Sequence, residues 1–255
     1  MTSDLEKVLL GDRPGDALRA LHKSGALAVV LPELANLDIH DAHSHKHKNN
    51  FDHSVKVLEN AISYEKDGPD LVLRVAALLH DIGKPATRRF EKGGATFRGH
   101  ENVGAKMVVS VLRRFGFDKS FISDVQELVK NHMRSFNFDT EVWTDSSVRR
   151  FRADLSSDVQ MSRLIVLFRS DLTTKHDSRR KKVLDKIDEL EVRLASVKEK
   201  DELAKRRPAI DGNRVMELTG LGPGRELGQI MNFLNSEEGL VLSVEEAEAE
   251  VLARV

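Results

Sequence analysis

Histidine and aspartate side chains stand on several predicted helices at positions where the apolar spacing calls for a hydrophobic residue. They are His53, His80, His132 and Asp171. The helix predicted over 119–132 illustrates the pattern, because its buried stripe consists of Val125, Leu128 and Val129. His132 is the next member of that series. Burying an unpaired polar group costs on the order of 2–7 kcal/mol, so several such groups in one core must compensate one another.

A bound metal ion would provide this compensation, because imidazoles and carboxylates are natural metal ligands and the ion neutralises the aspartates. For any one histidine, a hydrogen bond to a backbone carbonyl in the core is the simpler interpretation. Recurrence on several helices favours a metal site. The dipeptide His80-Asp81 fits this view, because neighbouring helix residues lie about 100° apart and reach one ion only near a helix end. Gly83 is predicted to supply that end.

Helical periodicity runs along nearly the whole chain, so the predicted fold is all-α. The stretch LVLRVAALL (71–79) is apolar almost all round, which predicts a helix at the centre of a bundle. Gly83, Pro85 and the pair Gly93-Gly94 predict a loop after it. The other helices predicted around the candidate ligands span residues 52–65, 100–115, 119–132, 145–154 and 157–173.

Three parts are predicted along the chain. Residues 1–39 form an N-terminal helical segment, residues 40–175 a domain that carries the histidines and aspartates, and residues 176–255 a helical extension. In the extension, a long helix over about 176–205 has apolar residues spaced 4-3-4-3 for only two heptads, which predicts packing on its own domain or on a dimer mate. Ser243 and Glu246 predict a capping box for a last helix.

The composition narrows the classes of function. The 255 residues include 40 Lys and Arg and 41 Asp and Glu, so the net charge of -1 attracts neither nucleic acid nor a membrane globally. The absence of cysteine excludes a disulfide framework, a thiolate metal site and a cysteine nucleophile. The longest apolar run, Ala26 to Leu31, is too short to span a bilayer, and the opening MTSDLEKV is unlike a signal peptide. A cytoplasmic protein is expected.

An ordered set of four residues, with its central dipeptide in the stretch ALLHDIGKP (77–85), resembles the metal-binding pattern of the HD superfamily of metal-dependent phosphohydrolases: His53, His80, Asp81 and Asp171. Two further histidines fall where two-metal members place second-site ligands, His100 in RGHENVGA and His132 in VKNHMRSF. The resemblance implies that the first four residues hold one divalent ion. It also implies that His100 and His132 hold a second ion and that Asp81 bridges the two.

The resemblance extends to a narrower family. The stretches HKNNFDHSVKVLENAI (47–62), GPDLVLRVAALLHDIGKPATRRFE (68–91), WTDSSVRRF (143–151) and DGNRVMELTGLGPGRELGQ (211–229) are similar to the C-terminal half of bacterial CCA-adding tRNA nucleotidyltransferases, notably the actinobacterial kind. One departure is Asn49, where that family usually has Asp. The chain contains neither the Gly-Ser nor the Asp-x-Asp motif of the nucleotidyltransferase head. We therefore expect no CCA addition, and whether the chain is a stand-alone protein or a fragment stays open.

The function implied by this resemblance is hydrolysis of 2′,3′-cyclic phosphate or 2′-phosphate ends of RNA or nucleotides, as in RNA end healing. Asp81 and Lys84 are the expected catalytic residues, and Lys84, Arg88 and Arg89 are the basic groups nearest in sequence that could bind the phosphate. The ligand set of four His and two Asp favours Mn, Co, Ni or Fe over Mg, and Zn accepts the same ligands.

Other functions remain open at this stage. One keeps the metals but changes the substrate to a deoxynucleotide triphosphate or a cyclic dinucleotide. Another is a non-catalytic tRNA-binding module that uses Arg149, Arg150, Arg152 and the glycine-rich turn at 221–228. A second histidine cluster in a polar loop is interpreted as solvated: His40, His43, His45 and His47. The oligomeric state is not predicted.

Overall fold

The predicted all-α fold is confirmed by the computed structural model, which describes residues 4–38, 49–92, 94–134, 143–174 and 176–255. Contacts divide the chain into two compact units, residues 1–192 and residues 193–255. The division falls inside α12 (Asp177–Lys205), and the three-part division predicted above stays a prediction. Among the described residues, no helix has both the length and the apolar character needed to cross a membrane.

The first unit begins with four short helices, α1 (Asp4–Leu10), α2 (Pro14–Lys23), α3 (Ala26–Val30) and α4 (Pro32–Ala35). Pro14 starts α2, where a missing N–H costs nothing. Gly25 separates α2 from α3 with a φ of 78°, a conformation that favours glycine. Each helix buries at least one leucine, which ties the helices together: Leu5 and Leu9, Leu18, Leu27, and Leu34.

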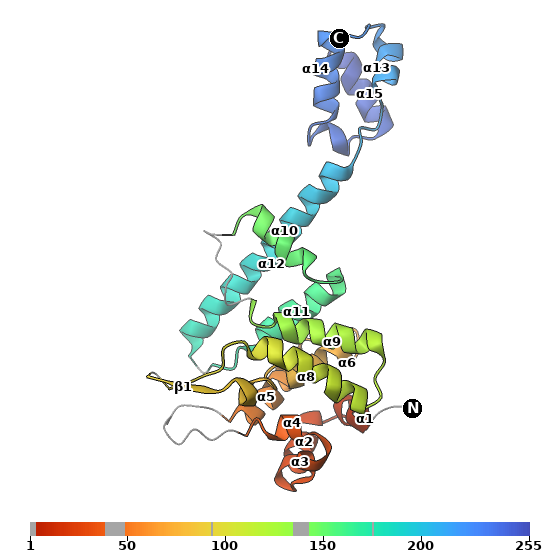
Figure 1. Cartoon of the computed structure of the whole chain (residues 1–255). Coiled ribbons are helices and arrows are strands. Elements are labelled where there is room, and N and C mark those ends of the chain that lie inside the picture. The colour runs from red at the N-terminus through yellow and green to blue at the C-terminus, as the bar shows by residue number, and fades with distance from the viewer. Residues whose placement is uncertain (1–3, 39–48, 93, 135–142, 175) are drawn as a thin grey trace. The chain divides into compact units, whose positions relative to one another are not determined.

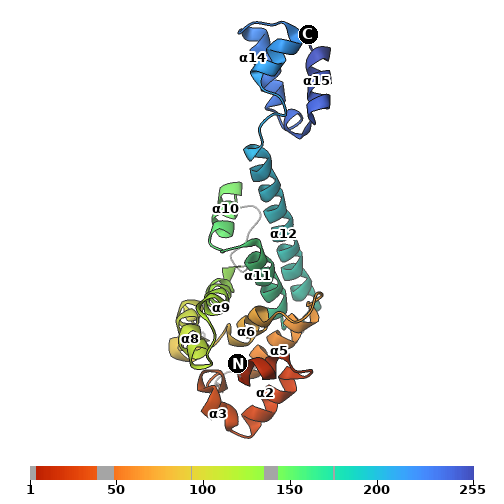
Figure 2. The same ribbon diagram turned by 90° about the vertical axis from the view of Figure 1, so that its right-hand side faces the viewer.

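The bundle that follows is built around α6 (Leu71–Leu79), whose bounds match the predicted range. All of its residues from Val72 onward are buried. It packs against α5 (Asn50–Ser63), α9 (Lys119–Asn131) and α11 (Asp158–Asp171), and α8 (His100–Arg114) packs on α9 (Figures 1 and 2). The sequence prediction of a helix at the centre of the bundle is therefore confirmed.

Side-chain caps fix where these helices start. The Asp70 carboxylate accepts a hydrogen bond from the Leu73 N–H at the start of α6, and Asp118 and Ser157 cap α9 and α11 in the same way. Asn49 caps α5 by accepting from the Phe51 N–H at 2.8 Å. Its amide also donates to Asp38 Oδ1 at 2.5 Å, so Asn49 links the N-terminal helices to the helix that carries His53.

The loop predicted after α6 is wrong in part. It contains a short helix, α7 (Lys84–Thr87), and a hairpin of two antiparallel strands, β1 (Arg89–Glu91) and β2 (Gly94–Thr96). Phe90 pairs with Ala95 in this hairpin. Three-residue strands are too short to show an alternating pattern in the sequence. The glycines and Pro85 therefore led to the prediction of a loop.

The predicted helices at about 145–154 and 176–205 are both present, as α10 and α12. Thr144 caps α10 (Asp145–Ala153) by accepting from the Ser147 N–H. Within the first unit, Ile187 and Leu190 of α12 are buried against the chain itself. Arg169 of α11 forms an ion pair with Asp188 at 2.7 Å. This ion pair joins the first half of α12 to α11, which lies in the range predicted to carry the histidines and aspartates.

The second unit has a separate apolar core. It contains α13 (Gly212–Thr219), α14 (Arg225–Leu234), a 3-10 turn (Gly239–Val241) and α15 (Val244–Ala253). The predicted capping box is confirmed, because Ser243 and Glu246 each accept from the other's backbone N–H. The core consists of Ile210, Val215, Ile230, Leu234, Ala247 and Val251.

Candidate metal centre

Five helices bring their ends to one place in the first unit. Each candidate ligand lies within a turn of a helix end, where the backbone can turn away and leave room for an ion. His53 is in the first turn of α5, His80 and Asp81 follow α6, His100 begins α8, His132 follows α9, and Asp171 ends α11. The structure therefore brings together all six residues that the sequence singled out as ligands.

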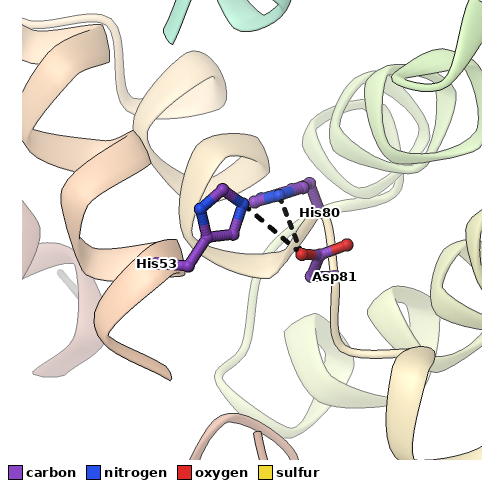
Figure 3. Close-up of side chains that lie close together, drawn as sticks. All are labelled: His53, His80 and Asp81. Carbon is purple, nitrogen blue, oxygen red and sulfur yellow. Dashed lines mark ion pairs between the residues drawn. The ribbon is translucent and has the colours of Figure 1, made fainter. Parts of the chain in front are cut away.

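The first group of ligand atoms surrounds one oxygen of Asp81. Its Oδ2 lies 3.6 Å from His53 Nε2 and 3.2 Å from His80 Nε2. Figure 3 shows these three side chains pointing toward one another. Asp171 Oδ1 completes the group, at 2.9 Å from His53 Nε2 and 3.7 Å from His80 Nε2. His53, His80 and Asp81 each offer one atom to a common cluster, as a shared cation would require.

The second group surrounds the other oxygen of the same carboxylate. Asp81 Oδ1 lies 3.2 Å from His100 Nε2 and 3.9 Å from His132 Nε2. The two histidine Nε2 atoms are 3.1 Å apart. Asp81 is buried, with 2% of its surface exposed, and its two oxygens are divided between the two groups. Each oxygen of Asp81 therefore lies close to a different group of histidine nitrogens.

Backbone contacts orient three of the rings. The Nδ1 atoms of His80, His100 and His132 lie 2.8, 2.8 and 2.7 Å from backbone carbonyl oxygens three residues earlier. An Nδ1–H that donates to a carbonyl leaves Nε2 as the lone-pair atom. The simple interpretation of a core histidine bonded to a carbonyl is thus correct for Nδ1. It leaves Nε2 unexplained.

When the rings of His80, His100 and His132 are neutral and donate through Nδ1–H, their Nε2 atoms are acceptors that face other acceptors. Among the described residues, the buried His80 Nε2 has no hydrogen-bond partner, although Asp81 Oδ2 lies 3.2 Å away. His100 Nε2 and His132 Nε2 repel each other at 3.1 Å unless a positive charge lies near both. The donor set therefore fits divalent cations, which would accept all of these lone pairs.

The pKa values of the buried groups also show that this site favours positive charge. Burial lowers the pKa of His80, but the negative charges of Asp81 and Asp171 outweigh burial and raise it to about 8. Burial and the neighbouring His80 charge lower the pKa of His132 to about 4. In the absence of a bound cation, His80 therefore takes up a proton at neutral pH, whereas His132 stays neutral.

Both carboxylates stay ionised in spite of their burial. For Asp81, burial raises the pKa, but the positive charges of His80 and Lys84 bring it well below its ordinary value. For Asp171, burial is outweighed by the hydrogen bond from His53 and the charge of His80, and its pKa falls to about 2. Two buried negative charges therefore face the rings at neutral pH.

Comparison with known proteins agrees with this arrangement. Residues 50–193, more than half of the chain, match the HD domain family. This chain belongs to the HD domain family. The resemblance to the HD superfamily predicted from the sequence is confirmed, and the matched range begins at the helix that carries His53.

Relatives of this HD domain chain include tRNA nucleotidyltransferases. It is 35% identical over 98% of its length to the CC-adding tRNA nucleotidyltransferase of Thermus thermophilus, of which it covers 55%. It is 31% identical over 89% of its length to the A-adding tRNA nucleotidyltransferase of Deinococcus radiodurans, of which it covers 52%. A multifunctional CCA protein of Pseudomonas fluorescens is 32% identical over 49% of the chain. The chain spans about half the length of the first two relatives.

The basic residues predicted to act in this HD domain differ in their surroundings. Lys84 Nζ donates to Asp81 Oδ2 at 2.5 Å, so its amine belongs to the centre. Arg88 lies with its guanidinium 4.7 Å from the centre of the Phe90 ring, and Arg89 is exposed on β1. Phosphate binding by Lys84, Arg88 and Arg89 stays a prediction.

Two residues support the HD domain centre without having been singled out as part of it. Thr173 Oγ1 lies 3.1 Å from His53 Nδ1, which gives the fourth ring a partner on its outer side. The signal in the sequence that could have identified Thr173 is its position two residues after Asp171. Gly83 was predicted only as a helix end, but a Cβ there would lie 2.1 Å from the His100 carbonyl oxygen and 2.6 Å from the Gly104 nitrogen. Glycine therefore lets the turn after α6 lie against the start of α8.

The polar loop with the second histidine cluster is outside the part of the chain that the structure describes. It holds His40, His43, His45 and His47.

Proposed function

We propose that this chain is a metal-dependent phosphohydrolase that acts on 2′,3′-cyclic phosphate or 2′-phosphate ends of RNA or nucleotides. The observation that carries the proposal is the division of the two Asp81 oxygens between two groups of histidine Nε2 atoms. Membership of the HD domain family and similarity to proteins named for tRNA support an RNA-related substrate.

In this proposal, His53, His80, Asp81 and Asp171 hold one ion, and Asp81, His100 and His132 hold the other. Two divalent ions, when bound, lower the pKa of a water molecule toward about 7 and offset the charge of the attacked phosphate. Imidazole-rich ligand sets suit Mn, Co, Ni or Fe better than Mg, which prefers oxygen ligands. The buried Asp81 fixes the spacing of the two groups because both of its oxygens are engaged.

Lys84 has the chemistry to act on the phosphate. An ammonium carries three N–H donors, and one of them is directed at Asp81 Oδ2. The remaining donors are available to non-bridging phosphate oxygens, since the side chain is 20% exposed. The ammonium also holds a proton that the departing ribose oxygen needs when a cyclic phosphate opens. Arg88 and Arg89 follow α7 and would extend the positive charge outward.

The test combines metal analysis with hydrolysis assays on 2′,3′-cAMP, 2′-AMP, 3′-AMP and bis-p-nitrophenyl phosphate across a metal series. We expect activity with transition metals on the cyclic phosphate or the 2′-phosphate, and loss of that activity in Asp81→Ala. The exposed Asp67 lies outside the centre, so Asp67→Ala is the matched control and should keep full activity. Equal activity in Asp81→Ala and Asp67→Ala would refute the proposal.

The same assays separate the two alternatives. Preference for a deoxynucleotide triphosphate or a cyclic dinucleotide would replace the proposed substrate while keeping the metal chemistry. Inactivity with every metal, together with tight tRNA binding, would favour the non-catalytic module. The arginines of α10 make that module testable, because Arg149 and Arg150 are exposed. The absence of Gly-Ser and Asp-x-Asp motifs from this chain predicts no nucleotide addition from CTP or ATP.

A further inference from the structure

The β1–β2 hairpin exposes an aromatic ring beside the proposed catalytic centre. Phe90 is 68% exposed, an unusual position for a large apolar side chain. The Arg88 guanidinium lies 4.7 Å from the centre of its ring, a cation–π distance. Across the strand pair, Phe90 faces Ala95, whose methyl group covers little of an aromatic surface. The ring is therefore held from one side by Arg88 and stays open to solvent.

Both ends of the hairpin are attached to residues of the centre. At its start, α7 leads directly into β1, and Lys84 at the beginning of α7 donates to Asp81. At its end, the Phe97 carbonyl oxygen lies 2.8 Å from His100 Nδ1. The Lys84 amine also lies 5.8 Å from the centre of the Phe97 ring. The hairpin is thus joined at both ends to residues of the proposed phosphate site.

A row of side chains connects Phe90 with Asp81. Phe90 faces Ala95, Phe97 follows two residues later along the strand direction, and the Phe97 ring contacts Lys84. Strand and cross-strand spacings allow this row a length of up to about 20 Å. Ala95, Phe97 and Lys84 separate Phe90 from Asp81, so Phe90 suits a base upstream of the terminal phosphate. Figure 1 shows the β1 hairpin extending outward from the helices.

The charge of the hairpin fits the same ligand. Residues 88–98 carry four basic side chains, Arg88, Arg89, Lys92 and Arg98, and one acidic residue, Glu91. Arg98 lies 3.4 Å from Glu91, and the segment as a whole is basic in a chain with a net charge of -1. Exposed aromatic rings among basic side chains are the usual means of binding single-stranded nucleic acid, because every base has a face that can stack.

We propose that Phe90, supported by Arg88, stacks an unpaired base of a single-stranded RNA whose 3′ end lies at the metal centre. This inference rests on the proposed function and narrows its substrate from mononucleotides to RNA ends. Phe90 is a specificity residue in this account and takes no part in the chemical step. It therefore acts on an oligonucleotide and leaves a mononucleotide unaffected.

The experiment compares two substrates in Phe90→Ala, Phe90→Trp and the unaltered chain. The substrates are 2′,3′-cAMP and a short unstructured RNA that ends in a 2′,3′-cyclic phosphate. We expect Phe90→Ala to lower kcat/KM for the RNA by about tenfold or more, through KM, and to leave 2′,3′-cAMP hydrolysis unchanged. Phe90→Trp should restore the RNA value. An equal kcat/KM for the RNA in all three proteins, or an equal loss of kcat/KM on both substrates, would refute base stacking on Phe90.

A binding measurement keeps this test separate from the proposed function. If neither substrate is hydrolysed, the phosphohydrolase proposal fails. The stacking of a base on Phe90 is then tested by the fluorescence anisotropy of a labelled single-stranded RNA. Weaker binding in Phe90→Ala with recovery in Phe90→Trp supports stacking. Val29 is 85% exposed in α3 and provides the control Val29→Ala, which should bind as the unaltered chain does. Equal RNA binding by Phe90→Ala and Val29→Ala would refute stacking.

Discussion

Two buried groups of charged side chains in the first unit differ in how they are satisfied. The pair of Arg74 and Glu65 is closed, because Arg74 Nε donates to Glu65 Oε1 at 2.8 Å, Nη2 donates to Oε2 at 2.5 Å, and Nη1 donates to the Leu9 carbonyl. The group around Asp81 is open, because Lys84 donates only to Oδ2, whereas the Nε2 atoms of His100 and His132 face each other and His100 Nε2 faces Oδ1. A closed group needs nothing further, whereas an open one needs a cation. The comparison distinguishes a charged pair that stabilises the fold from a charged group that can bind a cation.

The largest expected effect is on stability and comes from breaking the closed pair. Glu65→Ala leaves Arg74 buried without its partner carboxylate, which should lower the free energy of unfolding by about 3–5 kcal/mol. Urea unfolding measures this change. The exposed Glu238→Ala serves as the control and should unfold like the unaltered chain. A loss below 1 kcal/mol would show that the pair is not what holds α1 to α6.

The open group should respond to metal where the closed pair does not. Mn²⁺ at a hundred times its dissociation constant should stabilise the chain by about 2.7 kcal/mol, because the ion binds only the folded state. Thermal unfolding with and without a chelator measures the difference. Asp81→Asn should abolish it, and Glu65→Ala should retain it in the folded fraction. Equal metal stabilisation in Asp81→Asn would place the ion elsewhere.

The open group should also make the stability of the chelated protein depend on pH. The folded pKa of His80 is about 8, above its ordinary value of 6.5, so its contribution is complete below pH 6.5 and is lost as the pH rises through 8. The loss amounts to about 2 kcal/mol. The pKa of His132 is about 4, so stability also falls as the pH drops from 6.5 toward 4.

Chemical denaturation across pH 4–9 tests this prediction. Stability should be greatest near pH 6.5, the ordinary histidine value from which the two shifts run in opposite directions. His80→Gln should remove the decline above pH 6.5, and the exposed His176→Gln should keep it. A decline above pH 6.5 that persists in His80→Gln would assign the effect to another group.

The smallest expected effect comes from the outer side of the first group. Thr173→Val removes the hydroxyl 3.1 Å from His53 Nδ1, and loss of such a supporting contact lowers metal affinity by about 10-fold or more. Metal titration by calorimetry measures the affinity. Thr174→Val, one residue further along, is the matched control. Equal affinities would mean that the ring of His53 is held by packing alone.

The sequence predicted the parts of this arrangement that follow from periodicity. The range 71–79 was predicted to the residue because its apolar character is almost continuous, and the structure adds the Asp70 cap at its start. His132 and Asp171 were predicted to point inward because they continue apolar stripes, and both lie at the centre.

Other features depend on contacts between segments far apart in the chain. The closeness of Gly83 to His100 exists only once two helices are packed. Arg74 is bonded to Glu65, in the segment after α5, and to the Leu9 carbonyl of α1. No spacing rule in the sequence connects these three residues. The hairpin was missed because its strands are shorter than any period that could reveal them.

The central claim is that Asp81 joins two cation sites, and metal stoichiometry tests it most directly. Chelated protein reloaded with Mn²⁺, freed of excess metal and analysed by mass spectrometry should contain two ions per chain. His132→Ala should contain one, and Asp81→Asn should contain none at the same concentration. Two ions per chain in Asp81→Asn, or none in the unaltered chain, would contradict the claim.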